Sequence, residues 1–337
     1  MHFSRHSNQT TDHVLRPPSP SFTESSDGDF SSSQSTVVQL TENFRLNPDL
    51  GEFVSTIYSR AFKPQKLQPR KLANTLAKVE DDIGIDFAIQ PQIMKAVQQF
   101  LLGLSSAMLR KPQTILKPPP INSLAAPSLV DSPSVTEIAP HPISLALLQL
   151  ETLSARRTEG ISYEIHVRGE AQVAAALIMS IQRCAPSDDI FVATPHRVQR
   201  QAVRTALATA NAYLPLVEAM ERLGINSENE ERSGRKGTVT VDTVERLQGS
   251  EAAFVICLFS LPESASSDLK FLLERRRLNV AISRAKTLCI LVSSSTVLRP
   301  PVSVFADDGS AKGYAFLRAF EDRAWSGKIK VNADLIN

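Results

Sequence analysis

Hydrophobic and polar positions change period several times along the chain, and the region after residue 142 is the most regular. There, continuous apolar runs alternate with segments whose apolar residues recur every three to four positions. The pattern predicts helices over 143–156 and 169–183, and strands over 162–167, 189–193, 238–241, 253–259 and 288–293. Short buried strands separated by helices are typical of a parallel, doubly wound sheet. We therefore predict an α/β fold whose ligand crevice lies at the carboxyl ends of the strands.

Two further helix starts carry a capping signal. At Thr194 and Pro195, a threonine precedes a proline at the head of an amphipathic stretch, so we expect Thr194 to cap a helix. Asn47 and Pro48 repeat this arrangement near the N-terminus, where we expect Asn47 to be the cap.

Composition shifts divide the chain into five predicted segments. A linker element and then an insertion precede the α/β domain. The insertion has helical patterns over about 70–83 and 90–109. Low hydrophobicity together with many serines and prolines favours disorder in the first segment. The segments are a disordered stretch over 1–35, a linker element over 36–62, a helical and proline-rich insertion over 63–142, the α/β domain over 143–300, and a C-terminal extension over 301–337.

Overall composition excludes several classes of protein. The 337 residues are 42% apolar and 21% charged, close to globular averages, and the net charge is only +2. Contact with nucleic acid must therefore come from a local groove rather than from the field of the whole molecule. No run is long enough for a membrane span, and the three cysteines lie in apolar contexts without metal-like spacing. We expect an intracellular protein of the nucleus or cytoplasm, without a membrane partner or a metal site.

Candidate chemistry concentrates in residues 275–286, which read RRRLNVAISRAK. If this segment is helical, Arg277, Val280, Ala281 and Arg284 lie at i, i+3, i+4 and i+7, so two guanidinium groups share one face. Guanidinium forks pair with phosphate and can neutralise the charge that develops during phosphoryl transfer. A solvated basic helix end is the alternative interpretation of this run taken alone.

Four strings in order resemble the motifs of superfamily 1 helicases, in the branch that contains the nonsense-mediated-decay and immunodeficiency-linked enzymes. The string RRLNVAISRAK at 276–286 resembles their motif VI, and TVDTVERLQGSE at 240–251 resembles motif V. VATPHRVQ at 192–199 is similar to motif IV, and LTENFRLNP at 40–48 to the aromatic-arginine element between the two motor domains. The resemblance implies a second RecA-like, AAA-type domain with a doubly wound sheet like that of P-loop NTPases.

Two elements of the complete enzymes do not occur in these 337 residues. The sequence contains no G-x-x-x-x-G-K-[ST] phosphate loop and no apolar strand that ends in Asp-Glu. In the family the first RecA-like domain supplies both, so the resemblance covers the second motor domain only. It implies a truncated or separated chain that is inactive alone. ATP and Mg²⁺ are then expected only with a complementary first motor domain, supplied by a missing N-terminal region or by another chain.

The resemblance assigns two catalytic arginines. Arg284 matches the arginine finger that reaches the γ-phosphate across the domain cleft, and Arg45 matches the linker arginine that also approaches the phosphates. Phe44 stands where a tyrosine usually stacks on the nucleotide base, which keeps the ring and loses the hydroxyl group. A surface arginine ahead of a helix is the alternative for Arg45.

Further nucleotide contacts are expected at the end of motif V. Gly249 lies where the chain turns tightly and where a backbone without a side chain can approach a phosphate or ribose. Glu251 matches the acidic position that contacts the ribose, with a solvated loop carboxylate as the alternative. Arg277 is assigned to the nucleotide as well, from the helical face that it would share with Arg284.

Motifs IV and V also imply contacts with single-stranded DNA or RNA. A helix N-terminus at motif IV can accept a phosphate group. The residues assigned to the strand are Thr194, Pro195, Gln199, Thr243 and Gln248.

Two other functions stay open at this point. The chain is either a non-catalytic nucleic-acid-binding or regulatory protein derived from a helicase, or an unrelated doubly wound phosphate-binding protein. Four motifs in family order weigh against the second of these.

Overall fold

The structure is a computed structural model, and its described part lies within one compact unit, residues 41–337. The described residues are 42–43, 47–55, 63–64, 69–81, 89–109, 143–155, 160–224, 236–247 and 249–336. The predicted disordered stretch over 1–35 and most of the proline-rich passage before residue 143 lie outside them, as do Phe44, Arg45 and Gln248.

The main sheet has six parallel strands. They are β3 (Leu145–Leu153), β4 (Ile190–Thr194), β5 (Val239–Thr243), β6 (Ala252–Phe259), β7 (Ala285–Ser294) and β8 (Trp325–Asn332). Their order across the sheet is β5-β4-β6-β7-β3-β8, and every neighbouring pair is parallel. A short parallel pair, β1 (Glu42–Asn43) and β2 (Lys63–Pro64), stands apart from it.

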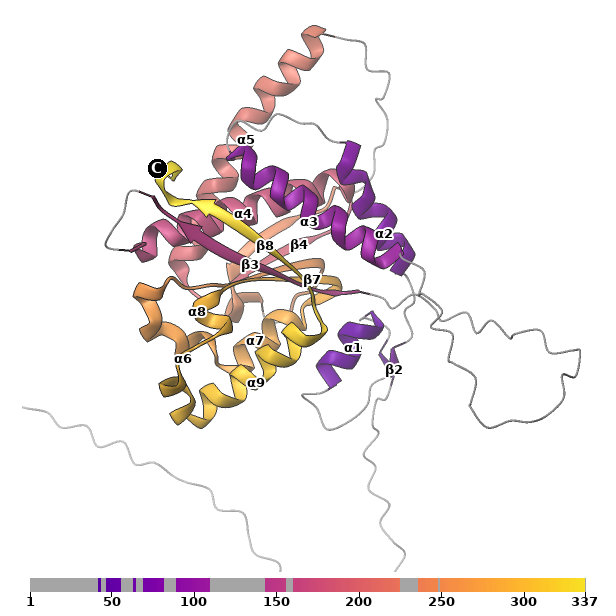
Figure 1. Cartoon of the computed structure of the whole chain (residues 1–337). Helices are drawn as coiled ribbons and strands as arrows, with labels where there is room; N and C mark the ends of the chain where they lie inside the picture. The colour runs from indigo at the N-terminus through magenta and orange to yellow at the C-terminus, as the bar shows by residue number, and fades with distance from the viewer. Residues whose placement is uncertain are drawn as a thin grey trace, which may run out of the picture. The chain divides into compact units, whose positions relative to one another are not determined.

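Helices cover both faces of this sheet (Figure 1). The helices of one face are α2 (Pro69–Ala77), α3 (Pro91–Leu109), α4 (Tyr163–Cys184) and α5 (Arg197–Gly224). Those of the other face are α1 (Pro48–Ser55), α6 (Leu269–Leu272), α7 (Arg275–Ile282), α8 (Ser295–Leu298) and α9 (Asp308–Arg323). The 3₁₀ turns are η1 (Lys78–Asp81), η2 (Val244–Leu247), η3 (Glu263–Asp268), η4 (Val302–Ala306) and η5 (Ala333–Leu335). None of the helices within the described ranges combines the length and apolar character needed to cross a membrane.

Alternate side chains of each central strand enter the two cores. In β6, Phe254 and Ile256 pack on the face of α3 and α4, whereas Val255 and Cys257 pack on the face of α7 and α9. Burial on both faces requires apolar residues at every position, which is why these strands read as continuous apolar runs. The predicted α/β, RecA-like doubly wound parallel sheet is confirmed.

The first two elements predicted after residue 142 are wrong. Residues 145–153 form the buried strand β3, where a helix was predicted over 143–156, and residues 162–167 open α4, where a strand was predicted. A short apolar run that is buried on all sides has no periodicity to separate helix from strand. Pairing with β7 and β8 decides in favour of a strand.

The cap predicted at Thr194 is wrong, whereas Asn47 does precede Pro48 at the start of α1, and its carbonyl accepts from the Gly51 amide at 2.9 Å. Thr194 is the last residue of β4, where its hydroxyl donates to the Asp242 carbonyl, and α5 begins three residues later. The Asn47 Nδ2 donates to Ser144 Oγ and to Thr287 O, and its Oδ1 has no hydrogen-bond partner in the described part of the chain. The side chains of Thr194 and Asn47 thus donate to distant carbonyl and hydroxyl groups, and no described residue donates to the Asn47 oxygen that would act as a side-chain cap.

Helices from the predicted insertion share the core of the α/β domain. The predicted helical patterns over 70–83 and 90–109 correspond to α2 with η1 and to α3. The Phe100 ring of α3 lies 4.9 Å from the Trp325 ring of β8, and a Cβ added at Gly103 would touch that tryptophan at 3.0 Å. One continuous core thus joins α3 to β8, a strand of the predicted C-terminal extension.

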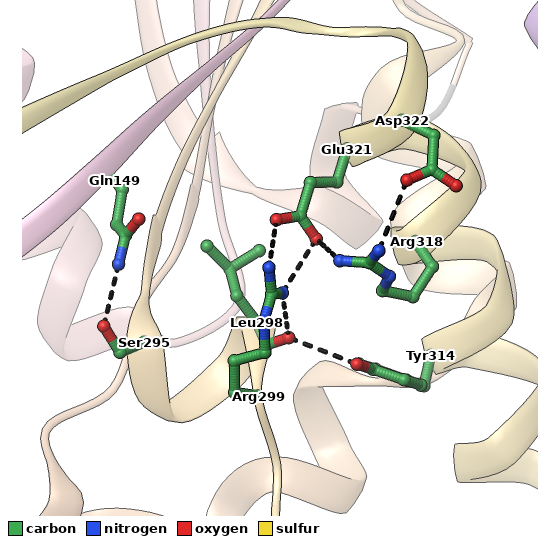
Figure 2. A network of polar contacts seen from close by, with 8 residues as sticks. All are labelled: Gln149, Ser295, Leu298, Arg299, Tyr314, Arg318, Glu321 and Asp322. Carbon is green, nitrogen blue, oxygen red and sulfur yellow. Dashed lines mark hydrogen bonds and ion pairs between the residues drawn. The ribbon is translucent and has the colours of Figure 1, made fainter.

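A polar network fastens α9 to the end of α8 (Figure 2). The Arg299 guanidinium forms a bidentate pair with Glu321, at 2.9 and 2.7 Å, and Arg318 pairs with the same carboxylate. The Tyr314 hydroxyl donates to the Leu298 carbonyl. Hydrogen bonds from Arg299 hold the pKa of Glu321 below its usual range. The guanidinium groups of both arginines bind the Glu321 carboxylate and so hold α9 in place. Helix α9 in turn packs beside α7.

Candidate functional site

Motifs V and VI meet where β6 and β7 begin. The Arg284 Nε donates to the Val280 carbonyl at 3.1 Å, and its Nη1 donates to the Ser250 carbonyl at 3.2 Å. The Arg284 carbonyl accepts from the Ala252 amide, which starts β6. The guanidinium group of Arg284 is therefore held against the last residues of motif V by carbonyl oxygens.

Arg277 and Arg284 do not share a helical face. Helix α7 ends at Ile282, and the Arg284 amide donates to the Ala281 carbonyl as the chain turns into β7. The sequence pattern suggested a longer helix because Ser283 and Arg284 have no strong tendency to end one. The start of β7 at Ala285 imposes the turn.

A left-handed turn lies beside Arg284. Gly249 has φ 88°, a backbone conformation that side-chain-bearing residues rarely adopt, and a Cβ built on it would meet nothing within 4 Å. Glycine is required here by conformation, and the turn is open to a ligand. Next to it, the Glu251 carboxylate pairs with Lys286 Nζ at 2.9 Å.

This group lies at the opposite edge of the sheet from the predicted crevice. Gly249, Glu251 and Arg284 immediately precede β6 or β7, so they lie at amino ends rather than carboxyl ends. Motif V begins within β5 and continues as η2, whose Val244 and Leu247 are buried against the sheet. The next strand along the chain, β6, is parallel to β5 and can be reached only by a crossover, which carries the second half of motif V to the amino edge.

The segment that leads into α1 contacts the same edge. The Asn47 amide donates to the Lys286 carbonyl at 3.3 Å, and Asp49 accepts a hydrogen bond from the Ser144 amide at the start of β3. Burial raises the pKa of Asp49, although its hydrogen bonds oppose that shift. The predicted contacts of Phe44 and Arg45 precede this segment and lie outside the described residues.

Arg277 lies at the beginning of α7, among partners from three elements. It pairs with Glu245 of η2 at 3.0 Å and with Glu274 at 2.9 Å, and only 13% of its side chain is exposed. Its Cζ lies 3.7 Å from the centroid of the Phe271 ring, which stacks on His196 after β4. These contacts tie motifs IV, V and VI to one another.

The residues predicted to contact a nucleic-acid strand face inward. Thr194, Pro195, Gln199 and Thr243 are all buried. The Gln199 Oε1 accepts from the His196 amide at 3.2 Å, which braces the turn before α5. The predicted strand contact at Gln248 lies outside the described residues. Side chains of motif IV thus shape the turn from inside.

A buried carboxyl group orients Gln199. Glu170 of α4 accepts from Gln199 Nε2 at 2.8 Å and from Ser260 Oγ at 2.6 Å, and Ser260 also contacts His166 Nε2 at 2.8 Å. Burial raises the pKa of Glu170 to about 7, and burial lowers the pKa of His166 to about 4. Both groups are therefore largely neutral near pH 6, as a buried network requires.

Three arginines gather around a single carboxylate at the carboxyl end of β5. Asp242 pairs with Arg200 at 2.9 Å, with Arg204 at 3.7 Å and with Arg246 at 3.9 Å. Burial acts to raise the pKa of Asp242, but hydrogen bonds from Arg200 and the Thr243 amide and the charges of Arg200 and Arg246 leave it lowered. The i, i+4 spacing of Arg200 with Arg204, and of Asp242 with Arg246, was the sequence signal for this cluster, which we did not predict.

Comparison with known proteins relates the chain to a domain family and to a yeast protein. The profile of a family described as an AAA domain matches residues 24–296. A protein of Saccharomyces cerevisiae named a putative ATP-dependent RNA helicase is 29% identical over 155 residues, which is 42% of this chain. The chain spans 14% of the length of that relative.

Proposed function

The chain belongs to the AAA domain family, and we propose that it is the second motor domain of an ATP-dependent superfamily 1 DNA or RNA helicase. In this role it supplies an arginine finger and single-strand contacts to an enzyme whose phosphate loop lies in a complementary first domain. The similarity to a putative ATP-dependent RNA helicase supports this proposal. So does the parallel RecA-like sheet that carries motifs IV, V and VI.

One observation carries the proposal: the Arg284 guanidinium is anchored by backbone carbonyls beside the Gly249 turn and has no carboxylate partner among the described residues. Its neighbours Arg277 and Lys286 pair with carboxylates at 2.9–3.0 Å. Arg284, in contrast, forms no ion pair with any described residue, and its guanidinium contacts only carbonyl oxygens. A fixed, uncompensated guanidinium that remains partly exposed is suited to a phosphoryl group whose negative charge grows in the transition state.

The neighbouring residues fit a nucleotide. The open, left-handed turn at Gly249 lets the backbone approach a phosphate or ribose, and the partly exposed Glu251 carboxylate can accept from ribose hydroxyl groups. We assign Arg45 and Phe44 to the same nucleotide, as linker arginine and stacking ring. ATP supplies the phosphoryl group, and Mg²⁺ is assigned to the complementary domain.

Turnover of ATP tests the proposal. The chain alone, with or without single strands, is expected to hydrolyse ATP only at background level. Addition of the first motor domain should give strand-stimulated turnover. In that pair Arg284→Ala should lower turnover by roughly 10³-fold or more, because the growing charge loses its partner. The control is Arg168→Ala, which removes an exposed arginine paired with Glu164 on α4.

Two outcomes would contradict this assignment. Turnover by the chain alone at the rate of a complete helicase would show that no complementary first motor domain is needed to hold ATP. If Arg284→Ala leaves ATP turnover of the reconstituted pair unchanged, Arg284 is not the arginine finger. Reconstitution that yields strand binding without turnover would favour the non-catalytic regulatory protein.

A further inference from the structure

The exposed side chains of motifs IV and V are not the ones predicted to bind single-stranded nucleic acid. Thr194, Gln199 and Thr243 are buried, so their side chains are closed to a large ligand. The arginines of α5 and η2 lie on the outer side of the same elements. The exposed fraction of the side chain is 48% for Arg204 and 67% for Arg246.

Asp242 gathers these arginines into one cluster. Nitrogens of Arg204 and Arg246 both lie within 4 Å of the same oxygen, Asp242 Oδ2, at 3.7 and 3.9 Å. Arg200, with 19% of its side chain exposed, holds the other oxygen at 2.9 Å. One carboxylate cannot neutralise three guanidinium groups, so the cluster keeps a net positive charge.

Two arginines in the first turn of α5, Arg197 and Arg200, are unfavourably placed for that helix. The first turn of α5 contains no acidic residue, and the sequence from Arg197 to Ala212 contains none at all. Cations near a helix N-terminus oppose the positive end of its dipole, so Arg197 and Arg200 reduce helix stability where an acidic residue would increase it. This stretch of α5 therefore offers no carboxylate of its own to compete with an anion for Arg204.

We propose that Arg204 and Arg246 form a phosphate-contact site for the backbone of single-stranded nucleic acid. The Val241 carbonyl holds Arg204 at 2.7 Å, the charge of Asp242 draws Arg204 and Arg246 together, and Arg200 fixes Asp242, so Asp242 and Arg200 act as positioning residues. The site reads charge and not sequence, since guanidinium groups here meet phosphates and no base edge. It rests on the proposed strand binding of this domain and gives that binding its residues.

Salt-dependent binding tests the site. An oligothymidine and an oligouridine of about 20 nucleotides, each fluorescently labelled, are titrated with the chain at several salt concentrations between about 50 and 200 mM. Each lost phosphate contact should reduce the slope of log K against log salt by about 0.7. Arg204→Ala and Arg246→Ala should each weaken binding roughly fivefold to tenfold at the lowest salt, and the double variant should lose about twice the slope.

Asp242→Asn is the decisive variant because its expected effect has the opposite sign. The amide keeps the Oδ1 acceptor for Arg200 and for the Thr243 amide, and it removes the charge that competes with phosphate for Arg204 and Arg246. Binding should therefore tighten, by a factor similar to the loss in the arginine variants. A purely structural cluster would lose affinity in both cases.

Lys312→Ala is the matched control, since Lys312 is 62% exposed and pairs with one carboxylate on the other face of the sheet. Its affinity and slope should equal those of the natural chain, and thermal melts should show every variant folded. Three results would each overturn the site. They are an unchanged salt slope in the double variant, weaker binding by the folded Asp242→Asn variant, and no binding of either oligonucleotide at low salt. If a duplex binds more tightly than the single strands and its binding depends on Arg246, the ligand of the site is the duplex and the single-strand proposal is wrong. None of these results touches the role of Arg284, which ATP turnover measures separately.

Discussion

At the scale of single residues, the distribution of partners separates cations that look equivalent in the sequence. Arg277 is held by two carboxylates and an aromatic ring, and Lys286 is held by Glu251. Arg284 contacts only carbonyl oxygens among the described residues. A cation held by a carboxylate of its own contributes little to a new ligand, because that pair must be broken first. Of these three cations, Arg284 is the one available to a phosphate.

Glu170 makes a pH-dependent contribution to stability. Its pKa is raised from 4.5 to about 7 in the folded chain because the carboxyl group is buried. Between these values the unfolded chain has lost the proton that the folded chain keeps. Stability therefore falls as pH rises from 4.5 to about 7, since the folded state binds more protons. His166, with a pKa lowered from 6.5 to about 4, acts in the opposite sense over about pH 4 to 6.5.

Glu170→Gln should remove the first of these terms. Relative to the natural chain, the variant should gain free energy of unfolding as pH rises from 4.5 to 7, by up to about 3 kcal/mol. The His166 term is common to both proteins and cancels in the difference. Urea unfolding at half-unit pH steps measures it. A difference that stays constant over this range would show that Glu170 ionises at its ordinary pKa.

At the scale of elements, one close crossing sets where α7 begins. Gly313 of α9 faces the loop ahead of α7, and a Cβ built on it would lie 1.5 Å from the Leu273 carbonyl oxygen. Only glycine allows the helix to approach this backbone. The clamp of Arg299, Glu321 and Arg318 holds the C-terminal half of α9, so the two contacts fix the helix beside α7.

Gly313→Ala should destabilise the chain by at least about 2 kcal/mol, because either the helix or the backbone at Leu273 must move. Gly309→Ala is the matched control in the same helix. Its added Cβ would approach only a side-chain oxygen of Asp307, at 3.3 Å, so we expect a change below about 1 kcal/mol. Free energies of unfolding in urea compare the two. Equal effects of both variants would mean that helix propensity, not the crossing, determines the result.

At the scale of the whole molecule, segments that the sequence separates share one core. Trp325 of β8, the only tryptophan of the chain, packs on Phe100 of α3. The Phe100 ring also closes over Gly327, where a Cβ would meet it at 2.7 Å. Helix α3 therefore covers the edge of the sheet, and its removal would expose β3 and β8 on that face.

Unfolding should accordingly be a single event for α3 and the sheet. Tryptophan fluorescence and far-ultraviolet circular dichroism should give the same urea midpoint. Phe100→Ala should lower both midpoints together, with a loss of about 3 to 5 kcal/mol from the cavity left behind. A fluorescence transition that precedes the loss of secondary structure would show that α3 docks and undocks independently.

Prediction from the sequence succeeded where local pattern and burial agree. The strands β4, β5, β6 and β7 lie close to the predicted runs, and α7 occupies the predicted place before β7. It failed at β3, where an apolar run has no period to read, and at the start of α4, where polar and apolar residues alternate from Ser162 to Val167. It also placed motif V at one edge of the sheet, whereas its turn reaches the other.

The sequence by itself determined the fold class and the family. Alternating buried strands and helices and four ordered motifs are local features, so they can be recognised without knowledge of tertiary contacts. Only the tertiary structure decided which charges are compensated, which motif residues face inward, and which strands are neighbours. These depend on pairs far apart in the chain, such as Arg277 with Glu245 and Asn47 with Thr287, 32 and 240 residues apart. Partners at such separations meet only when the whole sheet has formed, so no window of sequence contains them.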